Sequence, residues 1–419
     1  MLPKYIIKLL NRIAKEQDFI EYNFETKSGS NHGDNFLGVI ISVTLNGTKI
    51  QNGISKTEAI HLICKIPPMN ESRRKNFQSS IVFDRELYVY SKLLPAFIQF
   101  QRDRGLSEAD SFVSFPKVYA CESNEENGTY ALIMEDLRPK NFEMWPKEKA
   151  IPIDHALMVM KELGKFHAIS FAMKDQIPIE FEKFKQLKDT FCEIVLNGKM
   201  SSFMDRTIER ASNALINPEH KKLMNDFKKS YKQMLKGYFS ESSCDRFGVV
   251  GHGDCWNNNF LFQYCGKDKN RLQSICFLDW QITRYCSPVM DLLYNIFSGT
   301  DKELRDEHFE TLLKTYHSSL CKTIQKLGSD PDKLYTFENF KDEMKMFGKF
   351  ALLVGPMIIQ IRVANAKDIR DLDEYSELVE NGEDADILND FDEETQMVYS
   401  KQINDLFNDL LQYGYINKK

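Results

Sequence analysis

The sequence predicts an α+β protein with two lobes: a small β-rich N-terminal lobe and a large, mainly helical C-terminal lobe. Three observations predict this class. β-branched strand patterns are concentrated before residue 137, helical periodicity dominates from about residue 141, and a single pair of strands, 259–264 and 272–278, interrupts the helices. We therefore expect an N-terminal lobe of residues 1–137 and a C-terminal lobe of residues 138–419.

The N-terminal elements follow from local patterns. Strands are predicted at 36–45, near 48–51, at 59–66 and at 129–137. We expect the first two to form a hairpin at Asn46-Gly47, because this dipeptide favours a two-residue turn. Apolar periodicity predicts a helix at 80–94 that ends before Pro95.

The C-terminal lobe is predicted from apolar residues that recur with helical spacing. The expected helices are 153–173, 180–197, 201–214, 218–238, 289–298, 302–327, 336–363 and 397–412.

The composition describes a globular protein of 419 residues, with 42% hydrophobic and 28% charged residues. No apolar run approaches the ~20 residues of a membrane-spanning helix. Basic residues are spread through the apolar N-terminus, so we expect no signal peptide and no membrane contact. The nine cysteines are scattered without a Cys-x-x-Cys pair, which favours a reducing, cytoplasmic location. Oligomeric state is not readable from these patterns.

Charge is unevenly distributed along the chain. The net charge is −6, yet residues 367–396 hold thirteen acidic and two basic residues, which leaves +5 on the rest. A mildly basic body suits a small anionic ligand such as a nucleotide, and it lacks the basic stripe of a nucleic-acid binder. We expect this acidic segment, residues 367–396, to be a solvated excursion that its few apolar residues tether to the C-terminal lobe.

The most informative motif is VVGHGDCWNNNF at 249–260, followed by the strand that ends in CFLDWQ. Asp254, Asn259 and Asp279 are predicted at the ends of two adjacent strands, where their oxygens suit Mg²⁺. The order resembles the phosphoryl-transfer arrangement of kinases. Asp254 would then face the attacking hydroxyl as a base, while Asp279 and Asn259 would hold the metal.

Three further residues have mainly structural interpretations. His252 is predicted to hold the loop by hydrogen bonding. His167 is predicted to be a core histidine. Asp291 suits a helix N-terminus, and a brace for the catalytic loop is the alternative.

Lys65 and Glu86 are candidates for a phosphate clamp. Lys65 lies in a strand, HLICKIP, and Glu86 lies within an apolar stripe of the 80–94 helix. A carboxylate in such a stripe needs a cation, so we predict that Glu86 pairs with Lys65. The alternatives are an edge-strand lysine that reaches solvent and a glutamate paired locally with Arg85 or Lys92.

Two further segments are candidates for nucleotide contacts. The glycine-containing stretch TKSGSNHGDNFLGV could offer backbone N–H groups to phosphates, although its spacing matches neither a dinucleotide fingerprint nor a P-loop. Its candidates are Gly29, Ser30, Asn31 and Gly33. The stretch YALIMEDLRP could offer backbone groups to an adenine edge where the lobes join. Its candidates are Met134, Glu135, Asp136 and Leu137.

With these motifs the sequence resembles the ecdysteroid kinase-like family, which is related to choline kinases and aminoglycoside phosphotransferases. The matching stretches are GSNHGDNF, the Lys65 strand, FDRELYVY, LIMEDL, LGKFHAIS, HGDCWNNNFLF, FLDWQ and SPVMDLLY. The resemblance implies a protein-kinase-like fold and ATP- and Mg²⁺-dependent phosphorylation of a small-molecule hydroxyl, with ecdysteroids or other sterol-like or foreign alcohols as candidate acceptors. It also implies the same roles for Asp254, Asn259, Asp279, Lys65 and Glu86.

Other functions stay open from the sequence alone. A kinase for small polar alcohols of the choline or aminoglycoside type has the same motifs. A pseudokinase would bind nucleotide or partners without turnover, although the four polar site residues are intact. A metal-dependent hydrolase could use Asp254 and Asp279 but would not need the Lys65–Glu86 pair.

Overall fold

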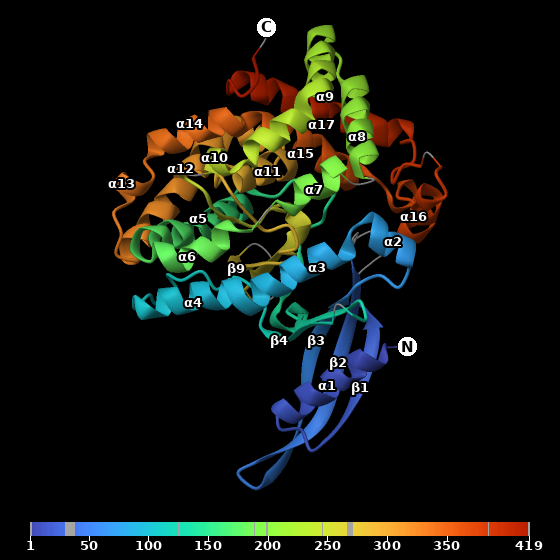
Figure 1. Cartoon of the computed structure of the whole chain (residues 1–419), viewed down its shortest axis with the longest axis vertical. Helices are drawn as coiled ribbons and strands as arrows, with labels where there is room; N and C mark the ends of the chain where they lie inside the picture. The colour runs from blue at the N-terminus through green and yellow to red at the C-terminus, as the bar shows by residue number, and fades with distance from the viewer. Residues whose placement is uncertain are drawn as a thin grey trace.

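The structure is a computed structural model of the whole chain. It describes residues 2–29, 38–124, 126–187, 189–197, 200–244, 246–265, 271–383 and 385–417. The predicted contributions of Ser30, Asn31 and Gly33 lie outside the described residues. The two predicted lobes are present and stand one above the other in Figure 1, with the β-rich lobe below and the helical lobe above.

The small lobe is built on a five-stranded antiparallel sheet with strand order β1-β2-β3-β5-β4. Its elements are α1 (Lys4–Glu16), β1 (Glu21–Ser28), β2 (Val39–Gln51), β3 (Ile54–Ile66), α2 (Glu71–Asn76), α3 (Ser79–Tyr88), a π-helical turn (Val89–Leu93), α4 (Leu94–Asp103), β4 (Val118–Asn124) and β5 (Thr129–Glu135). Helix α1 buries Ile6, Leu10 and Ile13 against residues of this sheet, so the sheet is covered on that side.

The predicted hairpin turn at Asn46-Gly47 is wrong. β2 runs through both residues, and the turn lies at a second Asn-Gly pair, Asn52-Gly53, with φ of 51° and 76°. Gln51 faces Ile54 across this two-residue turn. Gly47 serves packing instead, because a Cβ there would overlap the carbonyl of Glu21 in β1. A strand that was not predicted, β1, precedes the glycine-containing stretch, and β2 follows it.

The predicted helix end at Pro95 is also wrong. α3 continues through the π-helical turn into α4, and Pro95 is the second residue of α4, directly after that wider turn. The resulting long helix runs beneath the large lobe in Figure 1. Its first half packs Phe83 against Tyr130 of the sheet. Its second half packs Phe97 against Phe166 and Phe184 of the large lobe.

The large lobe is mainly helical and contains two small antiparallel sheets, β6-β8-β9 and β10-β7. Its elements are β6 (Phe142–Met144), α5 (Ile153–Gln176), α6 (Pro178–Lys185), α7 (Thr190–Asn197), α8 (Met200–Ala214), α9 (Pro218–Tyr238), α10 (Glu241–Cys244), β7 (Val249–Gly251), β8 (Phe260–Tyr264), β9 (Leu272–Phe277), β10 (Arg284–Cys286), α11 (Val289–Gly299), α12 (Lys302–Lys326), α13 (Pro331–Leu334), α14 (Phe337–Phe347), α15 (Ala351–Val363), α16 (Leu372–Glu380) and α17 (Glu393–Gln412).

Most predicted helices of this lobe are present, but two are divided. The helix predicted at 180–197 is α6 and α7, and the helix predicted at 336–363 is α14 and α15 joined by a tighter turn. Among the described residues, the stretch Pro331–Val363 is long and apolar enough to cross a membrane, but 83% of its apolar window is buried inside the protein. Such burial is typical of a core helix.

The acidic segment is not the solvated excursion that its charge predicted. Its described part contains α16, and it buries Leu372, Tyr375 and Ile387 in the main hydrophobic core. Ile369 and Leu388 are also buried and form a β-bridge that closes the segment on itself. Charge alone misled the prediction, because most apolar residues between the carboxylates are buried and the others are half-buried.

Candidate active site

The catalytic-loop candidate follows β7 and leads into a short 3-10 turn at Asn257–Asn259. Gly253 has a φ of 92°, and a Cβ at this position would overlap the carbonyl of Ile282. Only glycine fits this close approach without strain. The Gly-Asp pair of the motif therefore turns the chain so that Asp254 lies at the start of the loop.

Asp254 is held at both carboxylate oxygens. Tyr294 of α11 donates its hydroxyl to Oδ1 at 2.7 Å, and the Asn259 amide donates to Oδ2 at 2.9 Å. Burial and the charge of Asp279 raise the pKa of Asp254 to about 6, while the two hydrogen bonds act in the opposite direction. A carboxylate with this pKa is ionised at neutral pH and remains basic enough to accept a proton.

Tyr294 was missed by the sequence analysis, although a signal for it exists. It lies three residues after Asp291, so both side chains project from the same face of α11. Asp291 accepts the backbone N–H groups of His252 at 2.6 Å and Gly253 at 2.9 Å. One helical face therefore fixes both the backbone and the carboxylate of the loop.

Two histidines complete the support of this loop. His167 is fully buried and lies 3.2 Å from Asp291 and 2.9 Å from the Tyr316 hydroxyl. Burial alone would raise the pKa of Asp291, but His167 and His252 lower it to about 2, so this brace stays ionised. His252 accepts from the N–H of Asp254 and lies 2.8 Å from the carbonyl of Leu278. The predictions of a core His167 and a structural His252 are confirmed, and Asp291 is the brace.

Asp279 and Asn259 lie side by side at the ends of β9 and the 3-10 turn. The N–H of Leu278 donates to the carbonyl of Asn259 at 2.9 Å, which joins the two segments. Asp279 adopts a left-handed conformation with φ of 59°, which ends the strand and turns its side chain into the cleft. The Asn259 Nδ2 donates to both the backbone carbonyl and the carboxylate of Asp254. Its Oδ1 is therefore the atom left for a cation.

The predicted pairing of Lys65 with Glu86 is confirmed. Lys65 Nζ lies 2.8 Å from Glu86 Oε2, and both side chains are almost completely buried. The same Nζ contacts Asp279 Oδ1 of the large lobe. Burial opposes the charge of Lys65, but the two carboxylates outweigh it and raise its pKa, so the ammonium stays charged.

A cavity of 570 Å³ lies between the lobes at this cluster. This volume falls within the range of roughly 300–1,000 Å³ that is typical of small-molecule sites. It brings together most of the predicted site residues. Gly29, Lys65, Asn259, Asp279 and the predicted adenine segment line it. Two predicted site residues do not line the cavity: Glu86 lies behind Lys65, and Asp254 lies behind Asn259, which donates to it. Apart from Met134 and Leu137 of the predicted adenine segment, the apolar lining was not predicted; it consists of Ile40, Ile63, Phe142, Met144, Leu261 and Leu278.

The family comparison agrees with this geometry. The model of the ecdysteroid kinase-like family matches residues 32–329, which include the catalytic loop, the Lys65 strand and the Asp279 strand. The chain belongs to the ecdysteroid kinase-like family. As a member of this family it is a phosphotransferase that acts on an alcohol group of a small molecule. Its two-lobed architecture is the protein-kinase-like fold that the sequence predicted.

Solved structures with some similarity are distant. A GDP complex of a mutant aminoglycoside 2'-phosphotransferase-IIIa has a TM-score of 0.41 and 10% identity, covering 97% of this chain and 99% of that chain. A glucosamine kinase has a TM-score of 0.35 and 11% identity, with 96% and 81% coverage. An AMP-bound spectinomycin phosphotransferase has a TM-score of 0.28 and 12% identity, with 74% and 92% coverage. No curated protein matches the sequence.

Proposed function

We propose that the protein transfers the γ-phosphate of ATP, with Mg²⁺, to the hydroxyl of a small alcohol, and that ecdysteroids or other sterol-like alcohols are its acceptor class. The observation that carries the proposal is the contact of Lys65, from the small lobe, with Asp279, from the large lobe, at the floor of the inter-lobe cavity. A lysine and a carboxylate meeting there suit a bound nucleotide phosphate and its metal.

The apolar part of the cavity suits a nucleobase. Ile40 and Ile63 come from the small lobe, and Leu261 and Leu278 come from the large lobe, so a planar ring fits between them. The N–H groups of Glu135 and Asp136 already donate to Lys117 and His61. The N–H of Leu137 donates to no acceptor among the described residues, so we assign it to the adenine edge. It is the N–H donor that we propose within the predicted segment, whose carbonyls also remain candidates.

The oxygens beside Lys65 suit Mg²⁺. Asp279 offers a carboxylate and Asn259 offers an amide oxygen, and both line the cavity. Two hard oxygen ligands leave room for the waters and phosphate oxygens that Mg²⁺ prefers. No cluster of three or more His, Cys, Asp or Glu side chains suited to a metal occurs among the described residues, so this smaller oxygen site is the metal candidate. When bound, the metal would neutralise the phosphate charge.

Asp254 carries the proton transfer in this proposal. The acceptor oxygen forms a bond to the γ-phosphorus as the bond between that phosphorus and the β,γ-bridging oxygen breaks. The hydroxyl proton passes to Asp254, and ADP leaves with the bridging oxygen. Tyr294 and Asn259 hold the carboxylate in one orientation, so that little reorganisation is needed at the moment of transfer.

A transfer assay tests the proposal. ADP release would be measured with Mg·ATP and, in turn, an ecdysteroid, another sterol alcohol, a glycoside, choline and an aminoglycoside. We expect turnover with the sterol class and a loss of about 10²–10⁴ in kcat for Asp254→Asn, with nucleotide binding retained. Turnover with choline or aminoglycosides alone would show that the acceptors are small polar alcohols and not sterol-like alcohols. Nucleotide binding without transfer to any alcohol would identify a pseudokinase.

We also propose a cytoplasmic location and a lobe boundary between Leu137 and Arg138. The nine cysteines are all unpaired in the structure, which suits a reducing compartment. The boundary falls in the connection between β5 and β6, the strand that pairs with β8 of the large lobe. Fractionation of cells and limited proteolysis would test these two points.

A further inference from the structure

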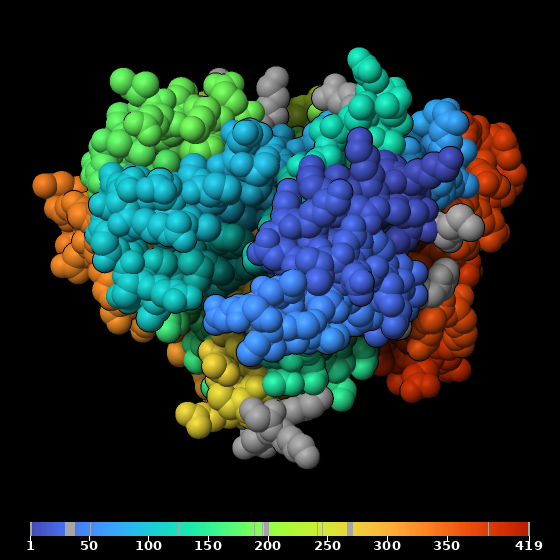
Figure 2. Space-filling view, turned by 90° about the horizontal axis from the view of Figure 1, so that it is seen from below, coloured from blue at the N-terminus to red at the C-terminus, as the bar shows by residue number. Residues whose placement is uncertain are grey.

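The acidic segment makes a second connection between the lobes, through contact of α16 with α2. These two helices lie side by side at the right of Figure 1, although about three hundred residues separate them in the sequence. Figure 2 shows the same neighbourhood from below, where the orange-red C-terminal part of the chain adjoins the blue small lobe. Asn76 donates to the carbonyl of Ser376 at 2.9 Å in a buried contact, and the rings of Phe77 and Tyr375 lie 6.3 Å apart.

The two helices are complementary in charge. α2 carries Arg73, Arg74 and Lys75, and α16 carries Asp373, Glu377 and Glu380 on the facing side. Arg73 lies 3.3 Å from Asp373, and Lys75 lies 3.7 Å from Glu380. Two hydrogen bonds add to these ion pairs. The Asn70 amide donates to Glu377 at 2.9 Å, and the Ser72 hydroxyl donates to Glu380.

The other end of the acidic segment is fixed to the large lobe. Arg206 and Arg210 of α8 lie 3.5 and 3.4 Å from Asp386. Arg210 also donates to the carbonyl of Leu388 at 3.3 Å. These bonds and the buried Ile387 attach the segment to the large lobe. The acidic face of α16 is therefore held against α2 by the large lobe.

The position of α2 bears directly on the candidate active site. α2 is the connection between β3, which carries Lys65, and α3, which carries Glu86. Arg74 of α2 also donates to the carbonyl of Gly128 at 3.1 Å, which ties α2 to the turn between β4 and β5. A displacement of α2 is therefore transmitted to the sheet that places Lys65 over Asp279.

We propose that Asp373, Glu377 and Glu380 are positioning residues for nucleotide binding: through α2 they hold the sheet so that Lys65 reaches the phosphate site. The inference rests on the proposed use of a nucleotide at this site. It gives the acidic segment a role in the reaction, beyond its contribution to the core. A contact that only stabilised the fold would affect unfolding and leave nucleotide affinity unchanged.

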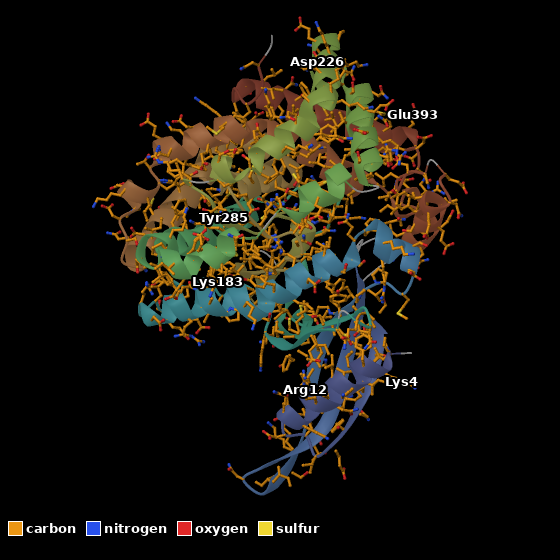
Figure 3. All side chains as sticks on the ribbon, viewed as in Figure 1. Lys4, Arg12, Lys183, Asp226, Tyr285 and Glu393 are labelled. Atoms are coloured by element: carbon orange, nitrogen blue, oxygen red, sulfur yellow. The ribbon has the colours of Figure 1, made fainter. Side chains whose placement is uncertain are left out.

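The test compares two triple variants with equal changes in charge. One carries Asp373→Lys, Glu377→Lys and Glu380→Lys. The matched control carries Glu383→Lys, Asp390→Lys and Glu393→Lys. These three control residues are exposed and lie outside α16, and Figure 3 places Glu393 on the large lobe at the start of α17.

Mg·ATP affinity is measured by calorimetry, and kcat is measured at saturating ATP. We expect the first variant to bind ATP about five- to twentyfold more weakly with kcat within about twofold of the parent, and the control to bind like the parent. Exchanging the two charges of one ion pair shows whether weaker binding comes from the lost pair or from misfolding. Arg73→Asp and Asp373→Arg should each weaken binding, and the double variant should recover most of the affinity.

The outcomes are distinguishable. If the parent binds no Mg·ATP, the proposed function fails and this inference fails with it. If the parent binds Mg·ATP and the α16 variant binds it equally well, only the inference is overturned. Loss of thermal stability at unchanged affinity, or a charge exchange that fails to recover binding, would also overturn it.

Discussion

Replacing Lys65 by Met tests the buried charge cluster most directly. The substitution leaves Glu86, whose side chain is 1% exposed, without its cation. Removing one member of a buried pair typically costs ~3–5 kcal/mol, because the other charge stays desolvated. Asp279 is 25% exposed and keeps access to water, so it adds little to this cost. We therefore expect a loss of about 3–5 kcal/mol in unfolding free energy from Lys65→Met.

Removing both charges should restore stability but not binding. In Lys65→Met with Glu86→Leu, apolar groups replace both partners, and such exchanges are often nearly neutral. We expect the double variant to unfold at nearly the parental urea concentration and yet to bind Mg·ATP much more weakly than the parent.

Urea unfolding followed by the fluorescence of the three tryptophans, of which Trp280 is fully buried, measures the unfolding free energy. Calorimetry measures the binding of Mg·ATP. Lys92→Met, at an exposed lysine of the same long helix, is the control. A double variant that is less stable than Lys65→Met alone would refute the buried-pair argument. A loss of unfolding free energy below about 1 kcal/mol for Lys65→Met would also refute it.

Three further predictions concern single side chains. Asp279→Ala should abolish the dependence of ATP binding on Mg²⁺ while leaving metal-free binding; calorimetry with and without Mg²⁺ checks this, and an unchanged Mg²⁺ dependence would exclude Asp279 as a ligand. Tyr294→Phe should lower kcat by about 10–100-fold with little change in the KM for ATP, because a hydrogen bond to a charged group is lost; a parental kcat would contradict this. Burial raises the pKa of Glu343 from 4.5 to about 7, so the folded state binds this proton more tightly than the unfolded state and parental stability falls as pH rises through that interval. Glu343→Gln should remove up to ~3 kcal/mol of that fall in urea titrations from pH 4.5 to 8, and parallel pH profiles would refute it.

The local motifs of the site were predictable from sequence because the chemistry demands them at short spacing. Sequence patterns alone predict the catalytic loop, Asp279 and the pairing of Lys65 with Glu86. Tyr294 was not predicted, because its role depends on how α11 lies against the loop. Its spacing from Asp291 was the available signal.

The errors in the fold have non-local causes. Two Asn-Gly pairs lie six residues apart, and the choice between them depends on β1, which approaches Gly47 too closely for a side chain. The end predicted at Pro95 ignored the π-helical turn that lets the helix continue. The acidic segment was judged by its charge, whereas its docking also uses buried apolar residues and basic residues of α2 and α8, which lie far away in the sequence.

The continuous helix from Ser79 to Asp103 has a consequence for regulation. Glu86 lies near its start, and Phe97, further along, packs against Phe166 and Phe184 of the large lobe. Rotating Glu86 out of the cleft would pull Phe97 from this aromatic contact, at a cost comparable to the ~3–5 kcal/mol of a buried phenylalanine truncation. The protein therefore lacks an inexpensive off-state of the kind made by swinging this helix outward.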